Sequence, residues 1–192
     1  MGLRRGRALL LLECVRLGSL RYHLPMSHPR AKPATPCRVL KLATLDDLLR
    51  ELDAIESADR AGTLRTCGNW SAGKILGHLS SWIDYAYDGF PSLPPAWVIP
   101  LFRLMKPVLM RDRPMRPGMR IPGTTEGTHG VDEMTTQEGL VRLRASIERL
   151  RATIPDRHPL FGVLTRQEWE RMHLNHAALH LGFISPNGDT HR

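Results

Sequence analysis

Apolar residues recur every three to four positions in four stretches of the chain, and this spacing is typical of amphipathic helices that bury one face. The clearest stripe consists of Leu140, Leu143, Ile147 and Leu150. The pattern predicts helices over about residues 45–58, from 69 or 71 to 88, over 137–153, and from 166 to 184. No stretch alternates with period two for long enough to predict a strand, and no internal repeat is present.

Three of these helices have a start signal in which a threonine is followed three residues later by an acidic residue, as in a capping box. The pairs are Thr44 with Asp47, Thr135 with Glu138, and Thr165 with Glu168. Four amphipathic helices with a shared core predict an all-α fold, a four-helix bundle.

The connection between the second and third helices, residues 90–135, is rich in Pro, Arg and Met. A connection of this length excludes short loops throughout, so we expect a bundle with a long crossover between helices 2 and 3. Within it, residues 97–110, WVIPLFRLMKPVLM, have the pattern of a short helix. Three interpretations remain open for this segment: packing across one end of the bundle, a lid over a site, or a membrane-surface patch.

The net charge of +8 arises entirely near the N-terminus, because residues 1–41 hold nine Lys and Arg against one acidic residue. The rest of the chain is neutral, which argues against nucleic acid as a partner. We expect residues 1–37 to be a disordered basic leader or sequence translated from a misassigned start, with Met26 a candidate true start. The bundle then spans 38–186 and is followed by a tail, 187–192.

Targeting and cysteine signals are weak. The apolar run Ala8 to Leu12 is shorter than a secretory signal requires, and no segment is long enough to span a membrane. Cys14, Cys37 and Cys67 are odd in number and lack CxxC spacing. We therefore expect free thiols, no disulfide, and a reducing, cytoplasmic location.

Histidines interrupt the apolar pattern of the fourth helix, MHLNHAALHLGF. At 100° per residue, Trp169, Met172, Leu179 and Phe183 fall on one side, which we expect to be buried, with His176 among them. His180 lies four residues after His176 and shares its face, so both imidazoles can reach one ion. His173 is too far along the axis from His180 to join that ion. We expect it beside the ligands or at the rim of the site, although a pair with His176 is an alternative.

A third ligand must come from another helix, and His78 is the only histidine inside the other three predicted helices. It flanks the apolar face of the second helix, at the border of the core. His129 and His158 lie in Gly- or Pro-rich connections, while His23, His28 and His191 lie in the tails. A histidine on an apolar face is often an ordinary core residue, but unpaired buried imidazoles are costly, at about 1–3 kcal/mol each.

We therefore predict a three-histidine metal site at His78, His176 and His180. Its ion is a divalent transition metal, with zinc expected first and nickel, copper, iron or manganese as alternatives. Asp84 and Glu170 are weak candidates for a general base, because each also has the pattern of a solvated helix charge.

The same residues resemble a known family. Residues 175–183, NHAALHLGF, are similar to the N-H-x-x-x-H-x-G-Q motif of DinB-like and YfiT-like metal-binding bundles, and NWSAGKILGHLSSW resembles their first ligand segment. Together with DGFP and HPLFGVLTRQEWERMHLNHAALHLGF, these motifs most resemble the branch called domain of unknown function 1569. The resemblance implies a bacterial four-helix bundle with a crossover and ligands at His78, His176 and His180. Phe183 stands where many relatives have Gln.

Two functions remain open. The first is a metal-dependent enzyme that either transfers a low-molecular-weight thiol to a small molecule or hydrolyses a small substrate. The resemblance implies thiol chemistry, because the resembled class includes thiol-dependent transferases and isomerases. The second is a noncatalytic ligand- or partner-binding bundle that uses the Met-rich crossover, with Met105, Met110, Met115 and Met119, as its contact surface. We expect no nucleic acid and no stable membrane insertion, and a homodimer is possible.

Overall fold

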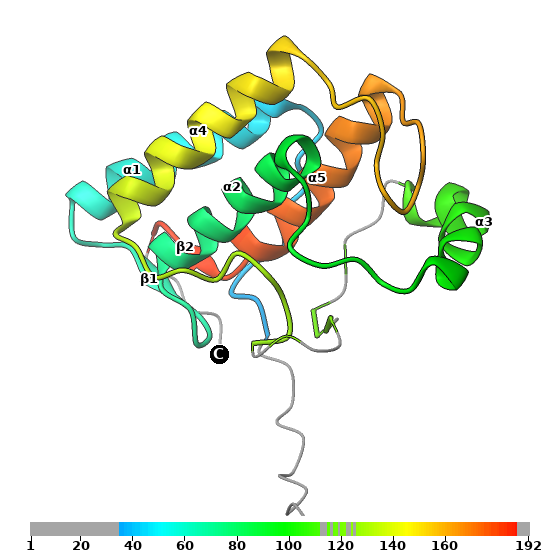
Figure 1. The fold of residues 1–192 in the computed structure, drawn as a ribbon. Helices are drawn as coiled ribbons and strands as arrows, with labels where there is room; N and C mark the ends of the chain where they lie inside the picture. Colours follow the sequence, from blue (N-terminus) through cyan, green and yellow to red (C-terminus); the bar gives the residue numbers. More distant parts are fainter. Residues whose placement is uncertain are drawn as a thin grey trace, which may run out of the picture. The chain divides into compact units, whose positions relative to one another are not determined.

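The computed structural model describes residues 35–111, 115, 117, 118, 120, 121, 124 and 126–187. Most of the expected leader, nearly all of the tail, and Met119 lie outside these residues. The helices of the described part are α1 (Leu45–Arg60), α2 (Ala72–Asp88), a short 3₁₀ turn η1 (Ala96–Val98), α3 (Ile99–Leu109), α4 (Thr136–Ala152) and α5 (Arg166–Leu181). The predicted all-α class is confirmed, with α1, α2, α4 and α5 as the four bundle helices (Figure 1).

The predicted start signals have the expected geometry. Thr44, Thr135 and Thr165 each accept a hydrogen bond from the backbone N–H three residues later, and the acidic residue at that position bonds back to the cap. Ser71 caps α2 in the simpler one-sided form. These local bonds satisfy N–H groups that the first helical turn leaves without partners, which explains why the helix starts were readable from the sequence.

The core lies where α2 packs along α4, with α1 and α5 completing it. The expected stripe of α4 is fully buried, from Leu140 to Leu150, and faces Ile75, Leu76 and Leu79 of α2. Close packing depends on Gly139, because a Cβ there would lie 2.7 Å from Cβ of Leu76 and 2.9 Å from the carbonyl oxygen of Gly73. The two helices can approach this closely only where a side chain is missing.

The buried face of α5 differs from the predicted one. Its core positions are Trp169, His173, Leu174, Ala177 and Leu181. Met172, Leu179 and Phe183, which were expected to be buried, are only partly so. The face is therefore rotated, because small Ala177 and the apolar Leu174 and Leu181 fill the space beside α2 and α1. As a result His176 and His180 lie at the border of the core.

The fourth helix also ends earlier than predicted, at Leu181. Ile184 and Ser185 instead form β2, which pairs antiparallel with β1 (Arg65–Thr66). The backbone N–H of Cys67 donates to the carbonyl of Phe183 at 2.9 Å, and that of Arg38 to the carbonyl of Gly182 at 3.2 Å. These bonds attach the segments before α1 and α2 to the end of α5.

Cys37 and Cys67 form a disulfide across this junction, with Cα atoms 5.7 Å apart. The expectation of free thiols is therefore wrong for these two residues, because the chain brings together cysteines that are 30 positions apart. The bridge also removes the argument from cysteine usage for a reducing compartment, so the cytoplasmic location stays a prediction.

Replacing Cys37 with Ser should destabilise the domain by about 3–4 kcal/mol, the loop-closure value for a bridge of this span. Denaturant unfolding with and without reductant measures the difference, and Cys14→Ser controls for loss of a thiol outside the bridge. Equal stability of the oxidised and reduced wild-type protein would contradict this prediction.

None of the helices in the described part of the chain is long and apolar enough to span a membrane. The short helix anticipated within the crossover is present as α3, which lies outside the four bundle helices (Figure 1). The crossover then returns past α2 before α4 begins at Thr136.

Candidate metal centre

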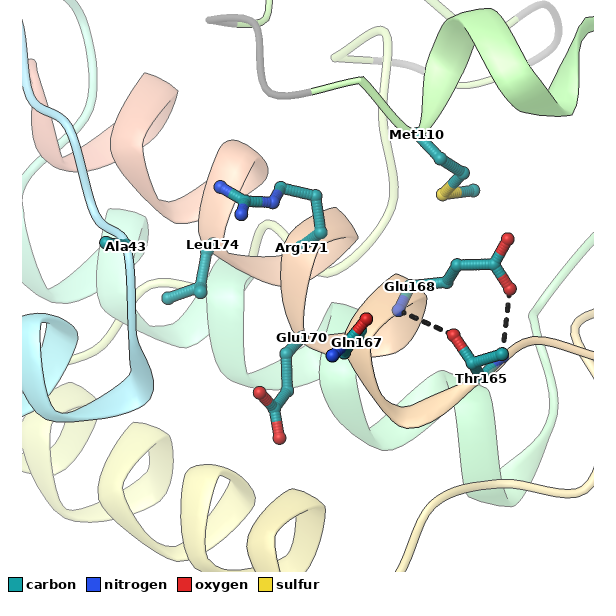
Figure 2. A pocket seen from close by; sticks show the side chains of 8 residues that line it. All are labelled: Ala43, Met110, Thr165, Gln167, Glu168, Glu170, Arg171 and Leu174. Carbon is teal, nitrogen blue, oxygen red and sulfur yellow. Dashed lines mark hydrogen bonds between the residues drawn. The ribbon is translucent and has the colours of Figure 1, made fainter.

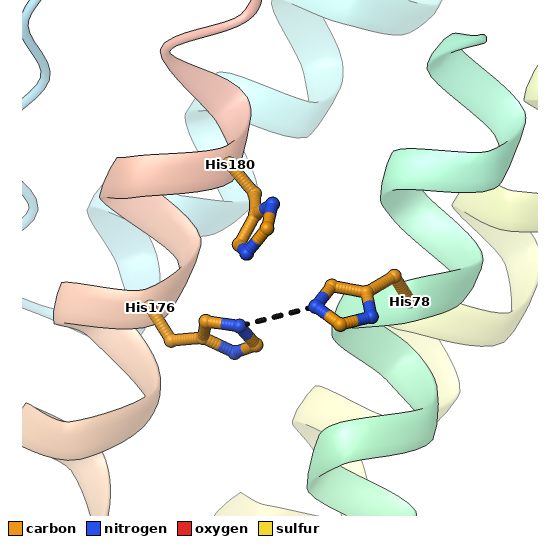
Figure 3. A group of neighbouring side chains, drawn as sticks. All are labelled: His78, His176 and His180. Atoms are coloured by element: carbon orange, nitrogen blue, oxygen red, sulfur yellow. Dashed lines mark hydrogen bonds between the residues drawn. The ribbon is translucent and has the colours of Figure 1, made fainter. Parts of the chain in front are cut away.

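Three histidines from two helices meet at the border of the core. His78 comes from α2, and His176 and His180 lie one turn apart on α5. One nitrogen of each ring lies within 4.8 Å of the others, and the Nε2 atoms of His78 and His176 are 3.2 Å apart. Figure 3 shows the three rings turned toward a common point. The structure therefore brings together the three residues that the sequence singled out.

The orientation of His78 is fixed by the crossover loop. Its Nδ1–H donates to the backbone carbonyl of His129 at 2.9 Å, and Nε1–H of Trp82 donates to the same oxygen at 3.3 Å. Because Nδ1 carries the proton, Nε2 of the neutral ring has a free lone pair facing the other two rings. No sequence pattern indicates this contact, since a backbone carbonyl can come from any residue type.

The three imidazoles are neutral in this environment. Burial lowers the pKa of His78 to about 4, although its bonds to the backbone of His129 and Gly130 oppose that shift. Burial, with the nearby His78, lowers the pKa of His180 to about 3. The pKa of His176 is also well below its usual value, first through burial and then through its histidine neighbours. Neutral imidazole is the form that binds metals, so protons do not compete for these nitrogens at neutral pH.

Aromatic side chains surround the three rings. Trp70 stacks on His180 with centroids 5.8 Å apart and meets His78 edge-on at 5.1 Å. Trp82 meets His176 edge-on at 5.4 Å, and Phe90 lies against Trp82. These rings limit water around the site and strengthen electrostatic interactions inside it. Trp70 and Trp82 were not predicted as site residues, although both flank His78 in the motif NWSAGKILGHLSSW.

This donor set fits a divalent transition-metal ion. Tetrahedral ligands at zinc–nitrogen bond lengths are about 3.3 Å apart, close to the observed spacing of His78 and His176. Three imidazoles leave a further position for another molecule, as in catalytic sites. His78 has the outer hydrogen bond that metal-binding histidines usually make.

Comparison with known families assigns the chain to one of them. One family model matches residues 34–187, most of the chain. The chain belongs to the family Protein of unknown function (DUF1569). No curated protein and no solved structure gives a significant match. The resemblance to domain of unknown function 1569 is thereby confirmed, while the wider DinB-like relationship stays a prediction; the family description carries no activity.

Two further histidines of this DUF1569 protein form a separate buried group. His173 is 6% exposed and stacks on Trp169, so its predicted position at the rim is wrong. His158 is 5% exposed, and its Nδ1 accepts from the backbone N–H groups of Leu160 and Phe161. His158 was not chosen as a ligand because it lies in a Pro-rich connection, yet these bonds fix its orientation. Neither residue belongs to the three-histidine group.

The two carboxylates considered as bases lie elsewhere in the DUF1569 fold. Asp84 accepts from Ser80 and Ser146 between α2 and α4. Glu170 is paired with Arg166 and lines a separate surface pocket of about 630 Å³, shown in Figure 2. The other residues around that pocket are Ala43, Met110, Thr165, Gln167, Glu168, Arg171 and Leu174. Both carboxylates thus have structural partners, which supports the interpretation of ordinary helix charges.

Proposed function

We propose that His78, His176 and His180 hold one divalent transition-metal ion and that the protein is a metal-dependent enzyme acting on a small molecule. The observation that carries this proposal is the meeting of three neutral imidazoles from two helices. His78 is buried and His176 and His180 are partly buried. Imidazole nitrogens removed from water in this way cost stability unless they find a partner, and a shared ion offsets that cost.

Each ligand has a defined part in this proposal. His78 offers Nε2, because the carbonyl of His129 holds the proton on Nδ1. Nε2 of His176 now donates to Nε2 of His78, so His176 becomes a ligand by moving its proton to Nδ1. His180 is the third ligand, one turn after His176 on α5, and Trp70 stacks on its ring.

The reaction class that suits the site is transfer of a low-molecular-weight thiol to a small electrophile, with hydrolysis as the alternative. A bound ion supplies Lewis acidity that favours the deprotonated, nucleophilic form of a thiol. The aromatic walls of Trp70, Trp82 and Phe90 offer apolar surface to the substrate and keep water out. Relation to the DinB-like bundles is part of the proposal, supported by the crossover between α2 and α4 and by the positions of the three histidines.

The enzyme proposal is tested with protein stripped by chelator and reloaded with zinc, nickel, iron or manganese. Each form is assayed for consumption of a small thiol in the presence of an electrophile, and for ester and amide hydrolysis. We expect turnover that returns only on reloading and is lost in His180→Ala. If the reloaded protein contains one ion per chain but is inactive in every assay, the enzyme proposal is refuted and the protein is a noncatalytic binding module.

Gly130 offers a test of the loop that orients His78. It has φ +68°, and a Cβ there would lie 2.6 Å from Cβ of Ser81. Gly130→Ala should push the neighbouring His129 carbonyl away from Nδ1 of His78 and weaken metal affinity by about 10–100-fold, as losses of such outer contacts do. Isothermal titration measures the affinity.

Gly62→Ala is the matched control, because Gly62 has φ +71° with nothing within 4 Å of the added Cβ. Both variants carry the backbone strain of a left-handed residue, but only Gly130 lies next to the His129 carbonyl. Equal metal affinities in the two variants would show that this contact does not support the site.

A further inference from the structure

Lys74 is a buried lysine on α2, one turn before His78. Only 6% of the residue is exposed. Its Nζ lies 2.9 Å from a carboxylate oxygen of Glu133 and 3.0 Å from one of Glu126. A buried ammonium group is costly unless it is paired, and these two carboxylates offset that cost. The hydrogen bond to Glu133 raises the pKa of Lys74, although burial opposes the shift, so the side chain is charged at neutral pH.

The two carboxylates lie at the two ends of one loop of the crossover, residues 126–133. This loop contains His129, whose backbone carbonyl accepts Nδ1–H of His78 at 2.9 Å. The carboxylate side chains are themselves exposed to solvent, by 41% in Glu126 and 70% in Glu133. One buried lysine thus holds both ends of the loop that orients the first proposed ligand.

Lys74 also contacts the tryptophan that supports the other helix of the site. Its ammonium group lies over the ring of Trp70, 5.6 Å from the ring centroid, which is a distance typical of a cation–π contact. Trp70 in turn stacks on His180 and meets His78 edge-on. Lys74 therefore contacts two of the features that hold the histidines in place, the loop and the tryptophan.

We propose that Lys74 is a positioning residue of the metal centre. By pairing with the two carboxylates it closes loop 126–133 over α2 and keeps the His129 carbonyl at Nδ1 of His78. Because the proton is then held on Nδ1, Nε2 of His78 is free for an ion, and Lys74 raises metal affinity without touching the metal. This inference rests on the proposed function, since it concerns one of the proposed ligands.

Lys74→Met tests this role, because methionine has an unbranched apolar side chain and no charge. We expect it to bind zinc about tenfold more weakly by isothermal titration, the lower end of the loss for outer contacts, because the loop can then move away from His78. Glu126→Ala with Glu133→Ala should give a similar loss through exposed residues outside the core. Circular dichroism checks that each variant is folded.

Lys106→Met is the matched control. Lys106 also pairs with a glutamate, Glu168 at 2.9 Å, but it lies on α3 and not on α2. It should bind zinc as the wild type does.

A second readout needs no metal. Nitrogen-15 spectra of histidine-labelled protein show which ring nitrogen of His78 carries the proton, and His78→Gln identifies the signal. Protonation at Nδ1 should be reduced in Lys74→Met and in the glutamate double variant, and retained in Lys106→Met.

An unchanged Nδ1 signal of His78 in both variants would overturn the inference. The close approach of Gly73 and Gly77 to Met134 would then be enough to hold the loop. The metal proposal would survive that result if the wild type binds zinc. If instead the wild type binds no zinc while the variants lose the Nδ1 signal, the metal proposal fails and the positioning of His78 by Lys74 stands.

Discussion

Replacing His176 with Ala is expected to lower the transition-metal content of the purified protein from about one ion per chain to less than a tenth. The two remaining imidazoles, His78 and His180, come from different helices and leave the ion with too few donors. Loss of an outer contact alone costs about 10–100-fold in affinity, so loss of a ligand should cost more than about 100-fold. Elemental analysis of protein prepared without a His-tag or added metal measures the effect.

His129→Gln is the matched control, since it removes a nearby imidazole but keeps the backbone carbonyl that holds His78. It should retain the metal. A second readout is the free energy of unfolding. A free metal concentration 1,000 times the dissociation constant should raise it by about 4 kcal/mol in the wild type and leave it unchanged in His176→Ala. Equal metal content in wild type and His176→Ala, with both folded, would refute the site.

Metal-free protein is expected to lose its stability in mild acid, between about pH 6.5 and 4. Burial lowers the pKa values of His78 and His158 to about 4 and that of His173 to about 3. Unfolded chains take up protons on these histidines as the pH falls below 6.5, whereas the folded protein does not. The stabilising contribution is therefore complete above pH 6.5 and is lost as the pH falls.

The size of this effect is large. At 1.36 kcal/mol per pKa unit the three histidines together represent roughly 10 kcal/mol, comparable with the whole stability of a typical domain. Urea unfolding at a series of pH values, in chelator, measures it. A free energy of unfolding that changes by less than about 2 kcal/mol between pH 7 and 4.5 would contradict the prediction.

His158→Gln separates this effect from general acid lability. A Gln oxygen can accept the backbone N–H groups of Leu160 and Phe161 that Nδ1 of His158 now accepts. The variant should therefore remain folded and unfold at a lower pH than the wild type. His129→Gln, which removes a half-buried imidazole, shows what loss of a histidine outside the buried group does.

The sequence determined the features that depend on neighbours along the chain. Helix starts at Thr44, Thr135 and Thr165 were readable because a cap and its partner are three residues apart. The pairing of His176 with His180 was readable for the same reason, since residues four apart share a helix face. His78 could be named as the third member because it is the only histidine within the other three predicted bundle helices.

Only the tertiary structure decided how distant segments meet. The disulfide between Cys37 and Cys67, the His129 carbonyl at Nδ1 of His78, and the stacking of Trp70 on His180 join residues far apart in sequence. The rotation of α5, which buried His173 and left His176 and His180 at the border of the core, followed from how the helices pack. The periodicity of apolar residues defines which faces of a helix can be buried, but packing against the other helices determines which face is buried.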